Sequence, residues 1–362
     1  MRIKIWLAAL LLSVWMTTSV LAEPLIITDM VGRTVTIQAE PQRIICIGPG
    51  ALRMIVYLDA QEKVVGVESM EKRLPAGRPY WLAQLQLRTL PDIGPGGPAA
   101  INKKPDMEAV LRVAPDLIVA TYMEAALADE VADTLGIPTV VLSCGELSVF
   151  DQAVYDSLKL AGRILDRRER ADAVIDYIEG LRGDLHHRTA TVFDRDKPGV
   201  FVGGIGYRGS HGIESTQRNY IPLDWNHAVN LAQRVESTIG SHVFVDEEVL
   251  LELNPDVIFI DGGGLALVAE DYRRKPDFYR ALTAFQSRRV YTLLPFNFYA
   301  TNIGTAMADA FAIGKMLYPS RFEDVRLADK ADEIFIFLVG QPVYAAMQLE
   351  YGDLGQPAPF ID

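Results

Sequence analysis

A glycine-rich segment near the middle of the chain carries the side chains best suited to binding chemistry. Residues 203–216 combine five glycines with Tyr207, Arg208, His211 and Glu214. An arginine can hold a carboxylate or another anionic group of a chelate. Phenolate and imidazole can ligate iron directly, so Tyr207 and His211 are candidate metal ligands, and His211 with Glu214 is a candidate pair for a bare divalent ion. The alternative is a tight hydrogen-bonded loop without ligand contact, because glycine-rich segments after strands often only turn.

A second group of candidates is aromatic. Phe296, Phe298 and Tyr299 follow an apolar strand-like run, and Trp225 lies in the same half of the chain. Aromatic walls suit a flat organic ligand such as a catecholate, haem or corrin. The alternative is that these rings belong to the apolar core at a strand end.

The elements that must position these residues alternate between strand and helix. Apolar runs at 43–47, 64–67 and 117–120 predict buried strands, with helical patterns between the later ones. Such alternation indicates a mostly parallel sheet, whose ligands bind beyond the carboxyl ends of the strands. In the first half of the chain this rule selects Pro49, Glu68 and Tyr122.

The chain repeats one helix–strand unit. Residues 108–118 and 248–258 match without a gap at an offset of 140 (255 − 115). In each copy an amphipathic helix begins near a glutamate and ends at Pro-Asp, and a β-rich run follows. The spacing is far too long for a solenoid, so we expect two similar α/β lobes with a cleft between them.

Residues 150–188 break this alternation. Their apolar positions recur near helical spacing without a proline, which predicts one long helix, kinked near Arg167–Arg170. Such a helix would be a stiff connector between the lobes, and a helix pair inside the second domain is the alternative. The predicted divisions are a signal peptide at 1–22, an N-terminal lobe at 23–149, the connecting helix at 150–188, and a C-terminal lobe at 189–362 whose tail forms a helix over 331–351.

The N-terminus and the charge balance limit the compartment and the partners. Arg2 and Lys4 precede the apolar run 5–16, and the small residues Val20 and Ala22 suit a cleavage site. This pattern is typical of a cleaved secretory signal peptide, so we expect export to the periplasm. Without that peptide the chain has 33 basic and 47 acidic residues, a charge of −14. Such a charge argues against nucleic acid as a partner.

Several motifs are missing. The sequence lacks a GxSxG nucleophile elbow and an HExxH zinc motif, and no histidine precedes His186. These absences argue against an enzyme and against a site for a bare metal ion, and we expect no cofactor. The alternative from another functional class is an exported two-domain enzyme. Cys46 and Cys144 would pair only if their Cα atoms lay within about 7 Å, and two separate buried thiols are favoured.

Four features together resemble a known family. They are the opening hairpin Asp29-x-x-Gly32-Arg33-x-Val35, the strand entry Pro41-x-Arg43-Ile44, the two Glu-x6-Pro-Asp units and the long central helix. Over residues 26–317 the chain is similar to the periplasmic solute-binding proteins of ABC importers for iron-siderophores, haem and cobalamin. The glycine-rich loop at 203–216 departs from the plainer loop expected in that family.

The resemblance implies two α/β lobes joined by a helix, with the ligand in the cleft. It implies a monomeric, non-catalytic carrier that captures a metal chelate, a ferric siderophore first of all, with haem, cobalamin, an oxyanion or another metal species as alternatives. The implied partner is the ABC permease dimer, which Glu108 and Glu248 would contact, one on each lobe. The alternative is that each glutamate only complements its helix dipole, and Glu247 is a nearby competitor.

Overall fold

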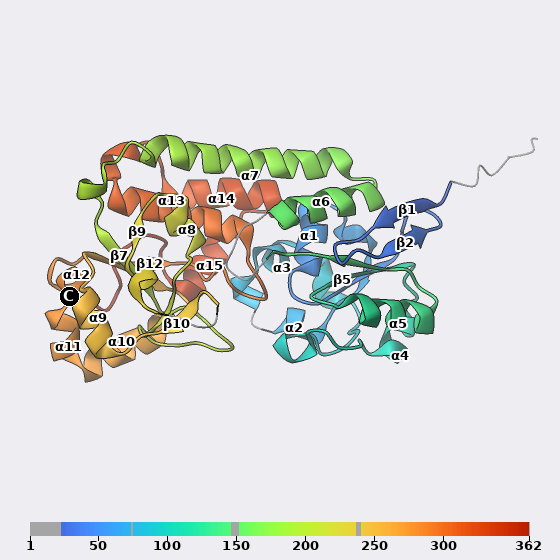
Figure 1. Ribbon diagram of the computed structural model, residues 1–362, viewed down its shortest axis with the longest axis horizontal. Coiled ribbons are helices and arrows are strands. Elements are labelled where there is room, and N and C mark those ends of the chain that lie inside the picture. The colour runs from blue at the N-terminus through green and yellow to red at the C-terminus, as the bar shows by residue number, and fades with distance from the viewer. Residues whose placement is uncertain (1–22, 74, 146–151, 237–239, 362) are drawn as a thin grey trace, which may run out of the picture.

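The computed structural model describes residues 23–73, 75–145, 152–236 and 240–361; the predicted signal peptide lies outside these ranges. Two α/β lobes lie side by side along the long axis of the molecule, and helix α7 runs along one side of both (Figure 1). This arrangement confirms the two-lobed fold that the internal repeat predicted. In the described residues, none of the helices has the length and apolar character needed to cross a membrane.

The N-terminal lobe is built on a four-stranded parallel sheet in the order β4-β3-β5-β6. Its strands are β3 (Ile44–Ile47), β4 (Val64–Gly66), β5 (Leu117–Thr121) and β6 (Thr139–Leu142). Strands β3, β5 and β6 are buried along their whole length, which explains why they read as continuous apolar runs. The helices of this lobe are α1 (Ala51–Tyr57), α2 (Ser69–Lys72), α3 (Pro79–Ala83), α4 (Met107–Val113) and α5 (Ala125–Leu135).

The C-terminal lobe repeats this topology. Its parallel sheet has the order β9-β7-β11-β12, and β11 takes the place that β5 has in the first lobe. The strands are β7 (Gly199–Gly203), β9 (Val229–Asn230), β11 (Val257–Asp261) and β12 (Val290–Leu293), with a separate antiparallel pair β8 (Ser215–Gln217) and β10 (His242–Phe244). The helices are α8 (Ile221–Asp224), α9 (Glu247–Leu253), α10 (Leu265–Arg274), α11 (Pro276–Ala281) and α12 (Thr283–Gln286).

The two copies of the repeated unit have the same local structure. Asp106 and Asp246 cap α4 and α9, each accepting a hydrogen bond from the amide three residues on, at 3.0 and 2.8 Å. Both helices end on a residue in the left-handed conformation, Ala114 with φ 43° and Asn254 with φ 36°. The sequence repeat is therefore a structural repeat that places equivalent helices on the two lobes.

The segment expected to form one long helix forms two, α6 (Gln152–Ile164) and α7 (Arg168–Thr189). Asp166 takes the left-handed conformation with φ 54°, and the Arg167 amide donates to the Gly162 carbonyl oxygen at 2.7 Å. This is a Schellman stop, in which an aspartate occupies the position that glycine usually fills. Helix α6 packs on α1 of the N-terminal lobe, so α7 alone is the connector. The proposed N-terminal lobe therefore extends beyond 149 to include α6, and the proposed C-terminal lobe still begins at 189.

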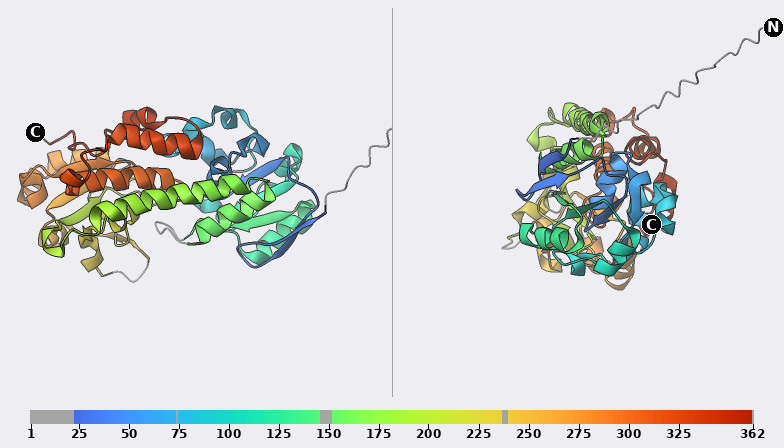
Figure 2. Two further views of the ribbon diagram at one scale, coloured as in Figure 1. Left: turned by 90° about the horizontal axis from the view of Figure 1, so that it is seen from above. Right: turned by 90° about the vertical axis from the view of Figure 1, so that its right-hand side faces the viewer.

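The C-terminal tail provides a second connection between the lobes. The helix expected over 331–351 is instead α14 (Leu327–Val339) and α15 (Tyr344–Tyr351), separated at Gly340 with φ 83°. Helix α14 packs on α13 (Ile303–Leu317) of its own lobe and on α1 and α3 of the other. Figure 2 shows these C-terminal helices beside α7. The lobes are thus fastened by two elements, and we expect small relative motions.

The opening hairpin forms as predicted from β1 (Leu25–Thr28) and β2 (Thr34–Ile37). The buried carboxylate of Asp29 accepts hydrogen bonds from the Arg33 amide at 2.9 Å and the Arg33 guanidinium at 2.9 Å. It also accepts one from the Val141 amide at 3.2 Å, which attaches the hairpin to β6. The aspartate and arginine of the motif are therefore structural.

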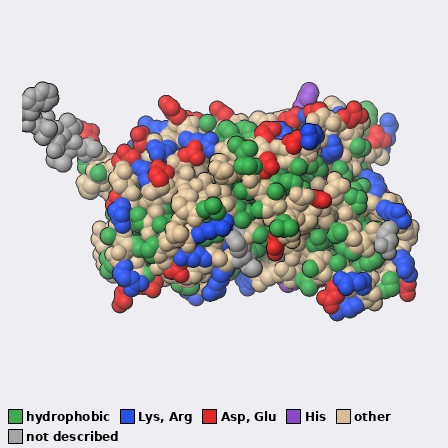
Figure 3. Space-filling view, turned by 180° about the vertical axis from the view of Figure 1, so that it is seen from behind, with side chains coloured by type: hydrophobic (Ala, Val, Ile, Leu, Met, Phe, Trp, Pro, Cys, Tyr) green, Lys and Arg blue, Asp and Glu red, His purple; other side chains and the backbone are tan. Residues whose placement is uncertain are grey.

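Two further sequence expectations concern cysteines and charge. Cys46 and Cys144 are free, buried thiols, as the favoured alternative predicted. Acidic and basic side chains are interspersed over the face shown in Figure 3, with apolar side chains between them. The absence of a nucleic-acid partner, which the formal charge of −12 favours, stays a prediction.

Candidate ligand-binding site between the lobes

A loop of the C-terminal lobe, residues 296–302 after β12, lies against the N-terminal lobe. The buried side-chain amide of Asn302 holds it in shape by donating hydrogen bonds to three carbonyl oxygens of the loop, at 2.9 to 3.3 Å. Tyr299 and Ala300 both have positive φ, 56° and 66°. Consecutive non-glycine residues in this region store backbone strain, which is commonest at functional sites. We refer to residues 296–302 as the junction loop.

The junction loop is bonded to the other lobe through Tyr299. Its hydroxyl donates to Oε2 of Glu68 at 2.5 Å and accepts a hydrogen bond from the Gly97 amide at 3.0 Å. The Gly48 amide donates to the same glutamate oxygen at 3.1 Å. Burial raises the pKa of Glu68 to about 7, although the bonds from Tyr299 and Gly48 act to lower it. Burial and the nearby Glu68 carboxylate also raise the pKa of Tyr299.

Close packing at this contact depends on a glycine. A Cβ atom at Gly96, which has φ 61°, would come within 2.7 Å of the Glu68 side chain. Glu68 is only 6% exposed, so its carboxyl group has little room to move. The contact between the lobes is therefore made by a fixed carboxyl group and a fixed phenol.

A buried arginine completes the junction. Arg53 on α1 is 2% exposed, and its Nη1 atom donates to the carbonyl oxygens of Tyr299 and Ala300 at 3.4 and 3.3 Å. Both bonds are long for a guanidinium donor. Within the described ranges, Arg53 has no carboxylate oxygen within 4 Å, although its charge acts to lower the pKa of the buried Glu71, which burial raises. Because buried charges in proteins are normally paired, this guanidinium would gain from an anionic partner.

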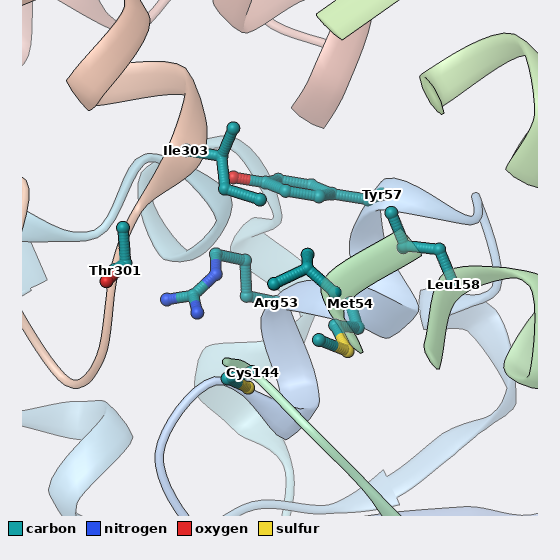
Figure 4. A pocket seen from close by; sticks show the side chains of 8 residues that line it. Arg53, Met54, Tyr57, Cys144, Leu158, Thr301 and Ile303 are labelled. Carbon is teal, nitrogen blue, oxygen red and sulfur yellow. The ribbon is translucent and has the colours of Figure 1, made fainter. Parts of the chain in front are cut away.

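The Arg53 guanidinium lies beside a small cavity between the lobes (Figure 4). Its walls include Tyr57 and Cys144 from the N-terminal lobe, Thr301 from the junction loop and Ile303 from the start of α13. The cavity measures about 10 Å³, which is room for about one water molecule. Its wall thus combines a buried cation with the amino end of a 15-residue helix, and both favour negative charge.

A second buried arginine has a structural role. Arg78 pairs with Glu71 at 3.2 Å, and its guanidinium lies 5.5 Å from the ring centre of Phe298. Tyr80 donates to the same glutamate at 2.8 Å. Phe298 of the junction loop therefore packs on a guanidinium of the other lobe that is in direct contact with a carboxylate.

The glycine-rich loop forms a separate, more exposed cluster. Tyr207 is 44% exposed and stacks on His242 with ring centres 4.3 Å apart, and Arg208 lies over the same tyrosine. His211 bonds through Nε2 to the Tyr207 carbonyl oxygen at 2.8 Å, and Glu214 accepts a backbone amide of its own loop at 3.1 Å. Across the part of the chain that is described, no three His, Cys, Asp or Glu side chains gather as a metal site. Direct ligation by Tyr207 and His211 stays a prediction.

The other predicted site residues lie nearer the core. The Pro49 carbonyl accepts from the Thr121 hydroxyl at 2.9 Å, and half-buried Tyr122 donates to a backbone oxygen at 3.4 Å. Phe296 is buried and packs edge-on against Tyr220, which leaves no exposed ring face at that position. Trp225 is half-buried against the same core. Of the sequence candidates, the structure thus brings Glu68, Phe298 and Tyr299 together at the junction between the lobes.

Arg53 was missing from the sequence candidates. It is the single charged residue in the run 51–58, which is otherwise apolar, and all seven residues of α1 are buried. A lone charge inside a fully apolar helix is the signal that could have identified it, because such a charge needs a partner from outside the helix.

The two glutamates predicted to contact a permease are free side chains. Glu108 and Glu248 are exposed in the first turns of α4 and α9, and within the described residues neither forms a hydrogen bond or an ion pair. Glu247, the competing residue, pairs with Lys275 at 2.7 Å. The equivalent positions of the two lobes therefore both present an unpaired carboxylate.

Known proteins resemble the chain along most of its length. The family model described as periplasmic binding protein matches residues 44–295. The molybdate-binding protein MolA of Haemophilus influenzae is 28% identical, covering 92% of this chain and 96% of that protein. An uncharacterized ABC transporter substrate-binding lipoprotein of Bacillus subtilis, YvrC, is 23% identical, covering 83% of this chain and 88% of that protein.

Among solved structures, MolA with bound molybdate aligns with a TM-score of 0.67 at 22% identity, covering 88% of this chain and 98% of that one. Helicobacter pylori CeuE with bound Ni(II) aligns with a TM-score of 0.62 at 17% identity, covering 90% of this chain and 100% of that one. At these identities the structures support the fold. The family match spans well over half of the chain, and this protein therefore belongs to the periplasmic binding protein family, whose members are substrate-binding proteins of transporters and not enzymes.

Proposed function

We propose that this protein captures a small metal oxyanion of the molybdate type in the periplasm, after removal of its signal peptide, and delivers it to an ABC permease. The observation that carries this proposal is the buried Arg53 guanidinium, which has no carboxylate oxygen within 4 Å in the part of the chain that the structure describes. It lies at the contact between the lobes, where a carrier of this family holds its cargo. The 28% identical relative named as molybdate-binding supports the same class of cargo.

The size of the site also favours a small anion. An oxyanion of five heavy atoms exceeds the space of about one water molecule beside Arg53, so the junction loop must withdraw for it to enter. Arg53 would then exchange two long bonds to carbonyl oxygens for shorter charge-assisted bonds to the anion. That withdrawal also breaks the Tyr299–Glu68 contact, because Tyr299 belongs to the loop, and a large chelate would require the surrounding packing to separate as well.

A ferric chelate is the second candidate, and the exposed loop with Tyr207 and Arg208 favours it. The phenol and the guanidinium are exposed on the C-terminal lobe, and among the described residues neither has a carboxylate partner, so they are accessible to an anionic chelate. Strand β10, whose His242 stacks on Tyr207, lies at the edge of its lobe that faces α2 of the other lobe (Figure 1). Haem or cobalamin would use the same exposed surface.

One titration experiment separates the two candidates. Calorimetry with molybdate, tungstate, sulfate and a ferric tris-catecholate is carried out on the wild type, Arg53→Met and Arg208→Met. We expect molybdate and tungstate to bind the wild type and Arg208→Met equally and to lose at least a hundredfold in affinity for Arg53→Met. Chelate binding that needs Arg208 and not Arg53 would replace the oxyanion proposal by the chelate one.

Delivery to the permease would use Glu108 and Glu248. A free carboxylate at the same position on each lobe can accept one Arg fork each, and two matched contacts strengthen one another. Replacing both glutamates by alanine should leave the affinity for cargo unchanged and abolish uptake into cells. A loss of cargo affinity in the purified variant would contradict the docking role.

A further inference from the structure

Helices α4 and α9, which carry Glu108 and Glu248, each expose a leucine about one turn after that glutamate. Leu111 on α4 is 55% exposed, and Leu251 on α9 is 40% exposed. Residues three apart on a helix lie on the same face, so each leucine lies beside the glutamate of its own helix. The remaining apolar residues of both helices are buried or half-buried.

A single exposed leucine is ordinary, but this pair repeats in an unusual way. The two helices align residue by residue at the offset of 140, from 107–113 to 247–253. Within these seven positions only the glutamate and the leucine are identical, and both are exposed in both copies. The buried positions have changed between similar apolar residues, and the exposed pair Arg112 and Glu252 has reversed its charge. Core packing explains the buried positions and cannot explain the identical exposed ones.

The two surfaces lie on one side of the molecule. Helices α4 and α9 both lie in the lower half of Figure 1, on the side away from α7 and toward opposite ends of the long axis, with α10 and α11 below α9. Each helix is fixed by an aspartate cap and a left-handed end, so each glutamate and leucine project from a rigid support. Two like surfaces at a fixed separation fit a partner that offers two like sites.

We infer that Leu111 and Leu251 are apolar contacts of the surface that docks on the permease, one on each lobe. This inference rests on the proposed docking role of Glu108 and Glu248. The partner surface it requires is twofold: each half combines an arginine or lysine with an adjacent apolar hollow. A leucine in such a hollow excludes water from the neighbouring ion pair, which strengthens the charge-assisted bonds.

The test measures binding of the exported chain to the ABC permease of the same host, reconstituted in lipid nanodiscs. We expect Leu111→Ala and Leu251→Ala each to weaken binding about tenfold and the double variant more than thirtyfold. The matched control is Leu349→Ala, which removes a leucine that is 91% exposed on α15 and should bind as the wild type does. Calorimetry with molybdate should give the same cargo affinity for every leucine variant.

The outcomes distinguish a failure of the leucine contacts from a failure of the proposed docking role of Glu108 and Glu248. If the leucine variants bind the permease as the wild type does while Glu108→Ala and Glu248→Ala do not, the leucine contacts are refuted and the glutamate docking role stands. If the glutamate variants also bind normally, both are refuted. A wild-type dimer in solution that Leu111→Ala converts to monomer would instead make this surface an interface between two copies of the chain.

Discussion

Replacing Glu68 by glutamine should stabilise the protein at pH 8 and leave its stability near pH 4 unchanged. The folded protein holds this carboxyl group where it is 6% exposed, with a pKa of about 7 instead of 4.5. Glutamine has nearly the same shape, and its oxygen can accept the bonds from Tyr299 and Gly48. The substitution therefore removes the ionisation and keeps the contact.

The sign follows from which state binds the proton. Below pH 4.5 Glu68 is protonated in both the folded and the unfolded chain, so it contributes nothing to the pH dependence. Between pH 4.5 and 7 the unfolded chain has released the proton and the folded chain has not, so stability falls as the pH rises. Above pH 7 the loss is complete and amounts to about 3 kcal/mol, which the glutamine variant does not suffer.

The assay is urea unfolding of wild type and Glu68→Gln at intervals between pH 4 and 8. Other buried acids, such as Asp261 with a pKa that burial raises to about 7, titrate in both proteins and cancel in the difference. The exposed Glu350→Gln controls for the loss of one negative charge. A stability difference that stays constant with pH, or a variant less stable than wild type at pH 8, would refute the reasoning.

Four further substitutions test the contacts that hold the junction and the two repeated helices in place. Asn302→Ala should lower the unfolding free energy by about 2–3 kcal/mol, because three hydrogen bonds within the junction loop are lost, and the loop amides should exchange hydrogen faster by mass spectrometry. Arg78→Met should cost about 3–5 kcal/mol in thermal unfolding, since it leaves the buried Glu71 carboxylate without its cation. Asp106→Ala and Asp246→Ala should each cost about 1 kcal/mol in urea unfolding and add in the double variant, because the two caps lie on different lobes.

The fold was predictable from sequence because the same helix–strand unit occurs twice in the chain. Identical caps, helix lengths and Pro-Asp ends recur at one offset, so the two lobes could be recognised without knowing how they pack. The break between α6 and α7 could not be predicted from the sequence, because Asp166 occupies a left-handed position at which a glycine is usually found. The second connection by α14 depends on long-range packing that no local pattern encodes.

The candidate site was predictable only in part. Glu68 and Tyr299 were selected because both follow strand ends, but their hydrogen bond joins residues 231 apart in the chain and depends on how the lobes meet. Arg53 was overlooked because helical periodicity assigns position 53 to a buried face, where a charge is unexpected. Phe296 shows the opposite error: its place after a strand end predicts a site residue, yet its ring packs in the core.

The double fastening of the lobes by α7 and α14 has a practical consequence for anyone who would turn this protein into a fluorescent sensor. Two dyes, one on each lobe, would report almost no change in separation when cargo binds, because both helices hold the lobes at a set distance. A single environment-sensitive dye beside residues 296–302 should give the larger signal, since that segment must leave its neighbours before anything can take its place.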